Sequence, residues 1–286
     1  MTSSSISVIL PAYNEGPGIH DLVRRIKAVL PASEIIVVDD GSDDDTAARA
    51  AEAGAVTVSC TYNIGNGAAI KMGARRASGD ILVFMDADGQ HRPEDIPSLL
   101  ELIGRYDMVV GARPWVAKGP LVRKLGNRVL IKLAESLTRR RIPDLTSGFR
   151  AVKRERFMNF IHLLPDGYSY PTTITLAMIM SAHFVKYVDL PGIGERRHGA
   201  SKINLIQDGV RFVNIILRMV MLFCPQRIFV PIGLLFLGAG CGMAVFQIVT
   251  RNGVFGSSII LWCTGVFTFF FGLLADQIAQ IRRQVK

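Results

Sequence analysis

Cysteine is scarce in this chain of 286 residues, and the four cysteines stand apart from one another. They are Cys60, Cys224, Cys241 and Cys263. None forms a C-x-x-C pair, so the sequence indicates neither a disulfide framework nor a zinc site. The opening residues, MTSSSISVIL, also lack the basic start and long apolar stretch of a secretory signal peptide, and we expect none to be present.

Charged residues are missing from two long stretches near the C-terminus. Residues 228–249 and 254–275 contain no Asp, Glu, Lys or Arg, and each matches the ~20 residues that cross ~30 Å of hydrocarbon. The glycine-rich sequence GAGCG at 238–242 suits close helix packing in a membrane. Buried core helices are the alternative, but two adjacent charge-free stretches of this length are rare in soluble domains. We expect residues 228–286 to form a two-span transmembrane hairpin with a short cytoplasmic tail.

Positive charge is concentrated on both sides of this hairpin. From residue 201 onward the chain has eight Lys or Arg against two Asp or Glu, and the turn between the spans offers only Arg251. The positive-inside bias places both outer ends, and therefore residues 1–225, in the cytoplasm. Residues 113–156 are also basic, but basic residues beside membrane spans suit an anionic membrane face or lipid headgroup better than nucleic acid. We expect a multi-pass protein of the cell inner (cytoplasmic) membrane without a nucleic-acid partner.

The first 200 residues alternate short apolar runs with helical patterns. The runs that predict strands are ISVIL (6–10), EIIVV (34–38), VTVS (56–59), ILVFM (81–85) and MVVG (108–111). Strands that are rich in Val and Ile and separated by helices favour an α/β domain with a mostly parallel, doubly wound sheet. We expect this domain to cover residues 1–200, and an interfacial helix over 201–227 to lead into the hairpin.

Polar residues follow the carboxyl ends of the predicted strands, where α/β sheets bind ligands. The first strand ends in PAYNE, the second in DDGS, the fourth in DADGQ and the fifth in GAR. A turn or a helix cap explains any one of these motifs, but not their recurrence at one sheet edge. Asp86 and Asp88 follow a buried run and offer hard oxygen ligands that suit Mg²⁺ or Mn²⁺, completed by water and phosphate oxygens.

Two other kinds of protein carry a similar pair of aspartates. A phosphatase of the haloacid dehalogenase type has D-x-D-G after its first strand, usually followed by Thr or Val, whereas here Gln90 follows and three strands come earlier. An EF-hand needs further ligands over a twelve-residue loop, and these are absent. A site for a nucleotide-sugar accounts for all the polar clusters together.

Seven motifs in this order carry a resemblance to a known family: PAYNE, VVDDGS, NIGNGAAI, MDADGQ, GAR, DLTSGFR and RRHGASK. From about Ile6 to Lys202, and on through the hairpin, the chain resembles the inverting family 2 glycosyltransferases of GT-A fold, in particular the dolichol-phosphate mannosyltransferase and polyprenyl-phosphate glycosyltransferase group. The resemblance implies a Rossmann-like GT-A domain and metal-dependent transfer of one sugar. The donor would be a UDP- or GDP-linked sugar, the acceptor a dolichyl or undecaprenyl monophosphate, and a homo-oligomer is compatible with it.

The same resemblance implies roles for individual residues. Nucleotide contacts are expected at Pro11, Tyr13, Glu15, Val38, Asp39, Asp40, Asn63, Asp86, Ala87 and Lys202. The metal, Mg²⁺ or Mn²⁺, is expected at Asp86, Asp88 and Gln90. Catalytic roles fall to Asp88, Arg113 and Arg196, and acceptor-phosphate contacts to Arg128 and Arg150. The choice between Asp39 and Asp40 stays open, and Asn66 is a departure because many relatives carry Lys there.

Elementary chemistry supports this interpretation. Departure of a nucleoside diphosphate builds negative charge, which a divalent cation and guanidinium groups stabilise. A processive polysaccharide synthase is an alternative, but neither Trp115 nor Trp262 lies in a Q-x-x-R-W motif, and two spans are too few for a polymer channel. Transfer to an uncharged lipid and a non-catalytic membrane accessory are further alternatives. The intact aspartate pair counts against the accessory.

Overall fold

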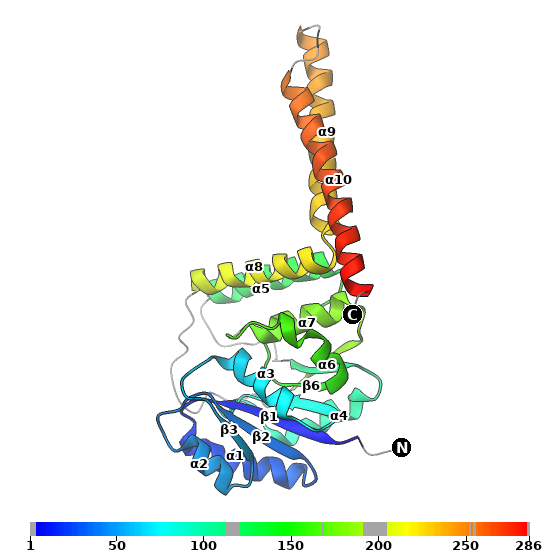
Figure 1. Cartoon of the computed structure of the whole chain (residues 1–286). Coiled ribbons are helices and arrows are strands. Elements are labelled where there is room, and N and C mark those ends of the chain that lie inside the picture. The colour runs from blue at the N-terminus through cyan, green and yellow to red at the C-terminus, as the bar shows by residue number, and fades with distance from the viewer. Residues whose placement is uncertain are drawn as a thin grey trace. The chain divides into compact units, whose positions relative to one another are not determined.

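The structure is a computed structural model that describes residues 4–112, 121–167, 169–190, 205–251, 253 and 256–284. The chain divides into two compact units, Met1–Ile215 and Ile216–Lys286. The first unit contains a sheet with its helices, and the second contains two long apolar helices (Figure 1).

Within the described residues, the first unit is built on one seven-stranded sheet. Its strands are β1 (Ile6–Ala12), β2 (Glu34–Asp39), β3 (Val56–Ser59), β4 (Ile81–Phe84), β5 (Met108–Ala112), β6 (Arg150–Lys153) and β7 (Val185–Asp189). The order across the sheet is β3-β2-β1-β4-β6-β5-β7. Only β6 runs antiparallel to its two neighbours, and the other pairs are parallel. The mostly parallel α/β sheet expected from the sequence is therefore confirmed.

The five strands expected from apolar runs are present; each starts where expected, and each ends within two residues of the expected end. Two strands were not predicted, β6 and β7. Strand β6 begins with an arginine and is four residues long, and β7 mixes partly buried and exposed residues at the edge of the sheet. Their strand structure comes from pairing with β4 and β5, because neither run has the local pattern of a buried strand.

The helices of this unit are α1 (Gly16–Val29), α2 (Thr46–Glu52), α3 (Asn66–Arg76), α4 (Ile96–Ile103), α5 (Leu121–Thr138), α6 (Arg154–Phe160) and α7 (Tyr170–Met180), and α8 (Leu205–Phe223) begins in it. Short 3₁₀ turns cover Pro93–Asp95 and Ile161–Leu163. The apolar face of α1 is buried, including Ile19 and Val23, against strand residues such as Val8 and Val37. Full burial of each such side chain contributes ~1.5–3 kcal/mol.

Helix α7 is buried on all sides, with only Ile179 partly exposed. Its threonines are hydrogen-bonded: Thr172 Oγ1 donates to the carbonyl of Leu145 at 3.1 Å, and Thr175 Oγ1 to that of Pro171 at 2.7 Å. Because its polar groups are satisfied inside the protein, α7 is a fixed support for the loop that contains Leu145.

The second unit contains α9 (Gln226–Arg251) and α10 (Gly256–Gln284), both long and apolar enough to cross a membrane. The helices approach closely at glycines: a Cβ on Gly240 would lie 2.9 Å from the backbone nitrogen of Trp262. Gln247 Nε2 donates to Ser257 Oγ at 2.8 Å. Close packing at small residues and polar pairs of this kind hold helices together in membranes, because the hydrophobic effect does not drive helices together inside lipid.

Candidate active site

Four aspartates lie at the carboxyl edge of the sheet. Asp39 is the last residue of β2 and Asp40 follows it, while Asp86 and Asp88 come directly after β4. Because β2, β1 and β4 are adjacent and parallel, these four side chains come to the same edge. Asp39, Asp40 and Asp88 are buried, whereas the Asp86 side chain keeps 29% of its surface exposed.

The loops after β1 and β2 are fastened to each other. The backbone N–H of Asn14 donates to Ser42 Oγ at 2.9 Å, and the N–H of Asp43 donates to Asn14 Oδ1 at 2.9 Å. Asn14 has a φ of 55°, which asparagine tolerates better than most residues. A third bond runs from the N–H of Glu15 to Thr46 Oγ1 at 2.9 Å. The segments PAYNE (11–15) and DDGSDDDT (39–46) are therefore held together by hydrogen bonds, and we call the pair of loops the rim.

Asp40 connects this rim to the glycine-containing loop before α3. Its Oδ1 accepts the N–H of Ile64 at 2.7 Å and its Oδ2 accepts the N–H of Gly65 at 2.9 Å. Asp39 Oδ1 accepts the N–H of Ser42 at 3.1 Å. Both oxygens of Asp40 are thus engaged, while Asp39 uses one oxygen in the hydrogen bonds of the described residues.

The other residues expected to contact a nucleotide and described by the structure also lie at strand ends or in these loops. Pro11 and Val38 are buried in β1 and β2, and Ala87 is buried between the two aspartates. Tyr13 and Asn63 are exposed, and Glu15 is partly buried at the start of α1. The structure therefore brings together at one edge residues that are spread over the first third of the chain.

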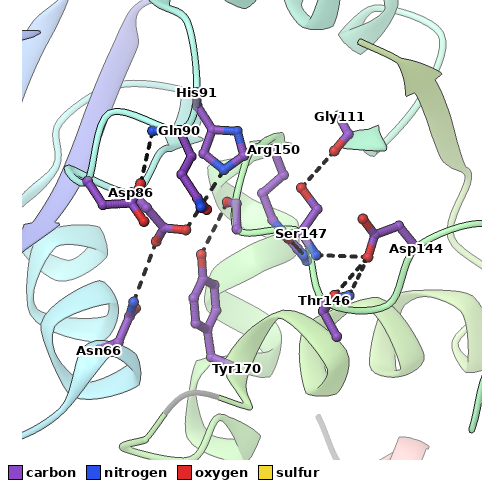
Figure 2. Close-up of polar contacts among 12 residues, drawn as sticks. Asn66, Asp86, Gln90, His91, Gly111, Asp144, Thr146, Ser147, Arg150 and Tyr170 are labelled. Atoms are coloured by element: carbon purple, nitrogen blue, oxygen red, sulfur yellow. Dashed lines mark hydrogen bonds and ion pairs between the residues drawn. The ribbon is translucent and has the colours of Figure 1, made fainter. Parts of the chain in front are cut away.

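Asp86 has long contacts with its polar neighbours (Figure 2). Asn66 Nδ2, on the first residue of α3, lies 3.5 Å from Asp86 Oδ1. His91 Nε2 lies 3.9 Å from Asp86 Oδ2, and its ring stacks on Phe149 with centroids 5.1 Å apart. Contacts of this length leave Asp86 free to coordinate a cation.

The set of oxygen donors fits a hard divalent cation. Asp86 makes no ion pair with Lys or Arg among the described residues. The same part of the chain contains no group of three or more His, Cys, Asp or Glu placed to hold a metal ion. Asp86 and Asp88, followed by Gln90, offer a partial oxygen set of the kind that Mg²⁺ completes elsewhere with water and substrate phosphates. Asn66 Oδ1 is buried without a hydrogen bond beside them, an acceptor that a metal-bound water could satisfy.

The segment DLTSGFR forms a tight turn against Asp86. Asp144 Oδ1 accepts the backbone N–H groups of Thr146 at 2.7 Å and Ser147 at 3.1 Å, and also the Thr146 hydroxyl at 3.0 Å. Gly148 then lies so close to the carboxylate that a Cβ there would stand 2.6 Å from Asp86 Oδ2. Only glycine fits at this position while Asp86 stays where it is.

The side chain of Arg150, the last residue of this segment, is completely buried. Its Nη1 donates to the carbonyl of Pro171 at 3.2 Å and to Thr175 Oγ1 at 3.1 Å, and its Nη2 donates to the carbonyl of Ser147. Burial lowers the pKa of Arg150. The guanidinium nevertheless keeps its charge, because its ordinary pKa lies so far above neutrality.

The expectation that Arg150 contacts the acceptor phosphate does not fit this geometry. Its side chain has no exposed surface, and both terminal nitrogens are bound to protein oxygens. Reaching a phosphate would break these bonds and leave buried carbonyls unsatisfied. Arg128, the other residue expected to bind that phosphate, is exposed on α5. Arg113, Arg196 and Lys202 lie outside the described residues.

Sequence reasoning did not single out Gly148, His91 or Tyr170. Tyr170 is the first residue of α7, and its hydroxyl donates to the carbonyl of Gly148 at 3.2 Å. Burial raises the pKa of Tyr170, so the hydroxyl keeps its proton and remains a donor. A glycine between Ser and Phe in TSGFR was the available signal for a close approach, but the sequence did not show what approaches it.

The fold and the site define a glycosyltransferase of the GT-A type. Residues 7–160, more than half of the chain, match the family described as Glycosyl transferase family 2, and the chain belongs to this family. Residues 224–281 match the GtrB C-terminal hairpin. The resemblance seen in the motifs is confirmed, as is the enzyme class.

Relatives of this chain are named as undecaprenyl-phosphate or dolichol-phosphate sugar transferases. The undecaprenyl-phosphate 4-deoxy-4-formamido-L-arabinose transferase of Sodalis glossinidius is 28% identical, over 100% of this chain and 92% of that protein. The dolichol-phosphate mannosyltransferase of Pyrococcus furiosus is 35% identical, over 69% of this chain and 59% of that protein. The undecaprenyl-phosphate mannosyltransferase of Micrococcus luteus is 33% identical, over 70% of this chain and 87% of that protein.

Solved structures support the same fold. Glucosyl-3-phosphoglycerate synthase from Mycobacterium tuberculosis, in complex with Mn²⁺ and uridine-diphosphate-glucose, is 25% identical, covers 76% of this chain and 79% of its own, and has a TM-score of 0.61. The complex of that enzyme with Mn²⁺, uridine diphosphate and glucosyl-3-phosphoglycerate has a TM-score of 0.59 at 26% identity, over 76% of this chain and 79% of its own.

Proposed function

We propose that this protein transfers a single sugar, with inversion, from a UDP- or GDP-linked donor to a polyprenyl monophosphate, dolichyl or undecaprenyl, at the cytoplasmic face of the membrane. The observation that carries the proposal is the pair Asp86 and Asp88 at the sheet edge that also holds Asp39 and Asp40. A partly exposed carboxylate with only long polar contacts suits a metal–diphosphate complex.

The donor nucleotide is proposed to lie across the rim formed by the loops after β1 and β2. Of the two candidate carboxylates, Asp39 is favoured for the base and ribose contact, because both oxygens of Asp40 already accept N–H groups of the glycine-containing loop. The exposed side chains of Tyr13 and Asn63 are available to a ligand at the same rim. Pro11, Glu15, Val38, Ala87 and Lys202 are proposed to complete the nucleotide site.

The metal, Mg²⁺ or Mn²⁺, is proposed to be held by Asp86, Asp88 and Gln90. When bound, the cation would neutralise the charge that develops on the departing diphosphate. Arg113 and Arg196 are proposed to stabilise the same charge through guanidinium hydrogen bonds. A phosphate acceptor is already anionic, so it needs cations to position it, and the exposed Arg128 is proposed to be one of them.

The membrane attachment is proposed to combine the hairpin with an interfacial segment over 201–227. Helix α8 supports this, since Val210, Leu217 and Met221 are exposed large apolar side chains at helical spacing. An exposed apolar stripe on a helix that also carries Arg211 and Arg218 suits the boundary between headgroups and acyl chains. The preceding residues 1–200 would then form a cytoplasmic catalytic domain.

A screen of donors with one acceptor tests the proposal. The full chain, purified in detergent with Mg²⁺ or Mn²⁺, is incubated with a short-chain polyprenyl phosphate and a panel of UDP- and GDP-sugars. We expect one donor to yield a prenyl-phosphate sugar of β configuration from an α-linked donor, detected by mass spectrometry and NMR. Hydrolysis or polymer formation in place of this product would contradict the proposal.

The proposed orientation predicts the position of each end of the hairpin. A reporter fused after Lys286 is expected to lie in the cytoplasm, and one inserted at Asn252 outside, because basic residues flank both outer ends. Paired alkaline phosphatase and green fluorescent protein fusions at both sites measure this. Phosphatase activity at Lys286 together with fluorescence at Asn252 would show the opposite orientation and contradict the proposal.

A further inference from the structure

We propose that Tyr170 and Arg150 are positioning residues that hold the backbone at Ser147 and Gly148 against Asp86, and so set the orientation of this carboxylate for the metal. The inference rests on the metal role proposed for Asp86. It concerns two buried side chains that would not touch the metal or either substrate.

The first step is the contact between the turn and the carboxylate. A Cβ on Gly148 would lie 2.6 Å from Asp86 Oδ2 and 3.1 Å from Oδ1, so the bare Cα borders both oxygens. No short polar contact fixes the carboxylate instead, since Asn66 Nδ2 lies 3.5 Å from Oδ1 and His91 Nε2 lies 3.9 Å from Oδ2. The rotamer of Asp86 is therefore limited mainly by the position of the Gly148 backbone.

The second step is what fixes that backbone. Two consecutive carbonyls of the turn accept side-chain donors: Arg150, the last residue of the same segment, donates from Nη2 to the carbonyl of Ser147, and Tyr170 of α7 donates its hydroxyl to that of Gly148 (Figure 2). The guanidinium carbon of Arg150 also lies 5.8 Å from the centre of the Tyr170 ring. The two side chains thus form one unit behind the turn.

The third step connects this unit to the strand that leads to Asp86. Arg150 is the first residue of β6 and pairs with Phe84, the last residue of β4, two positions before Asp86. The Phe84 ring also packs edge-on against Tyr170, with centroids 6.3 Å apart. Carboxylate and turn are therefore anchored to the same two paired strands, which keeps their separation constant.

Fold stability alone is a poor explanation for a charge at this position. Burying a guanidinium is unfavourable unless its donors find partners, and an apolar side chain would avoid that cost. Arg150 nevertheless has no exposed surface, and its Nε has no hydrogen-bond partner. Its satisfied donors reach the Ser147 carbonyl and the start of α7, which are the two parts that must be joined.

Tyr170→Phe is the test with the smallest structural change. It removes one hydroxyl and with it the bond to Gly148, while Tyr187→Phe is a matched control, since the buried Tyr187 hydroxyl has no hydrogen-bond partner. Mn²⁺ alone is titrated into the full chain in detergent, and the free ion is followed by its electron paramagnetic resonance signal. We expect Tyr170→Phe to weaken Mn²⁺ binding about fivefold, the equivalent of one net hydrogen bond, and Tyr187→Phe to leave it unchanged.

Gly148→Ala is a second, stronger variant. Its methyl group would displace the Asp86 carboxylate, so we expect Mn²⁺ binding to weaken by at least about tenfold. Gly104→Ala, where a Cβ meets nothing within 4 Å, is its control. Asp86→Asn removes the proposed carboxylate ligand itself, so its Mn²⁺ binding gives the reference value for complete loss of that ligand.

The outcomes separate the two proposals. If Asp86→Asn binds Mn²⁺ as wild type does, the metal role of Asp86 is wrong. If Asp86→Asn loses Mn²⁺ while Tyr170→Phe and Gly148→Ala bind it normally, the positioning role is wrong and the metal role stands. If Tyr170→Phe and Tyr187→Phe weaken Mn²⁺ binding equally, the positioning role is also wrong, because the effect would then come from a general loosening of the fold.

Discussion

Asp88→Asn is expected to lower the rate of sugar transfer on the order of 10²- to 10³-fold while the protein still folds and inserts into the membrane. The substitution removes a negative charge from the proposed metal site but keeps an oxygen at the same place. That oxygen accepts the backbone N–H of Gln90 at 3.1 Å, and an asparagine oxygen can accept it equally. The loss would therefore report on metal coordination, and initial rates at saturating donor and acceptor measure it.

Chelation should reproduce the effect in the unmodified protein. Excess EDTA is expected to abolish transfer, and Mg²⁺ or Mn²⁺ added back to restore it. Glu101→Gln makes the same carboxylate-to-amide change on the exposed surface of α4 and should leave the rate unchanged. Full activity in excess chelator would rule out the metal role.

A prenyl alcohol is expected to be inert where the matching prenyl phosphate is an efficient acceptor. An alcohol must lose a proton during attack, and a general base that takes it contributes ~10²- to 10⁴-fold to the rate. A phosphate monoester has a second pKa of ~6 and is already anionic near neutrality. The proposed mechanism is therefore direct attack by the phosphate on the anomeric carbon, and parallel assays of the two acceptors measure the difference.

Asp144 is the carboxylate that could serve as a base, and the structure shows it in another role. Its Oδ1 accepts two backbone N–H groups and a hydroxyl within the turn that borders Asp86. An asparagine oxygen can accept the same bonds, so Asp144→Asn is expected to keep activity within about tenfold of wild type. Efficient glycosylation of the alcohol, or an Asp144→Asn protein that binds both substrates without turnover, would contradict attack without a base.

Much of the fold could be predicted because its signals are local. A run such as ILVFM has a strand pattern in any context, and charge-free stretches of membrane-spanning length need no neighbours to be recognised. The order of polar motifs after strands placed Asp39, Asp40, Asp86 and Asp88 at one edge, since parallel strands share their direction. Strands β6 and β7 escaped prediction because pairing across the sheet, and not their own residues, makes them strands.

The sequence by itself determined the α/β class, the apolar hairpin, and which side chains gather at the carboxyl edge of the sheet, because periodicity and strand direction are properties of the chain. Only the tertiary structure decided what surrounds those side chains. It turned Arg150 from an expected phosphate contact into a buried support of the turn, and it gave Tyr170 the carbonyl of Gly148 as a partner. The physical reason is that burial and hydrogen bonding depend on segments brought together from distant parts of the chain, and no local pattern records which ones will meet.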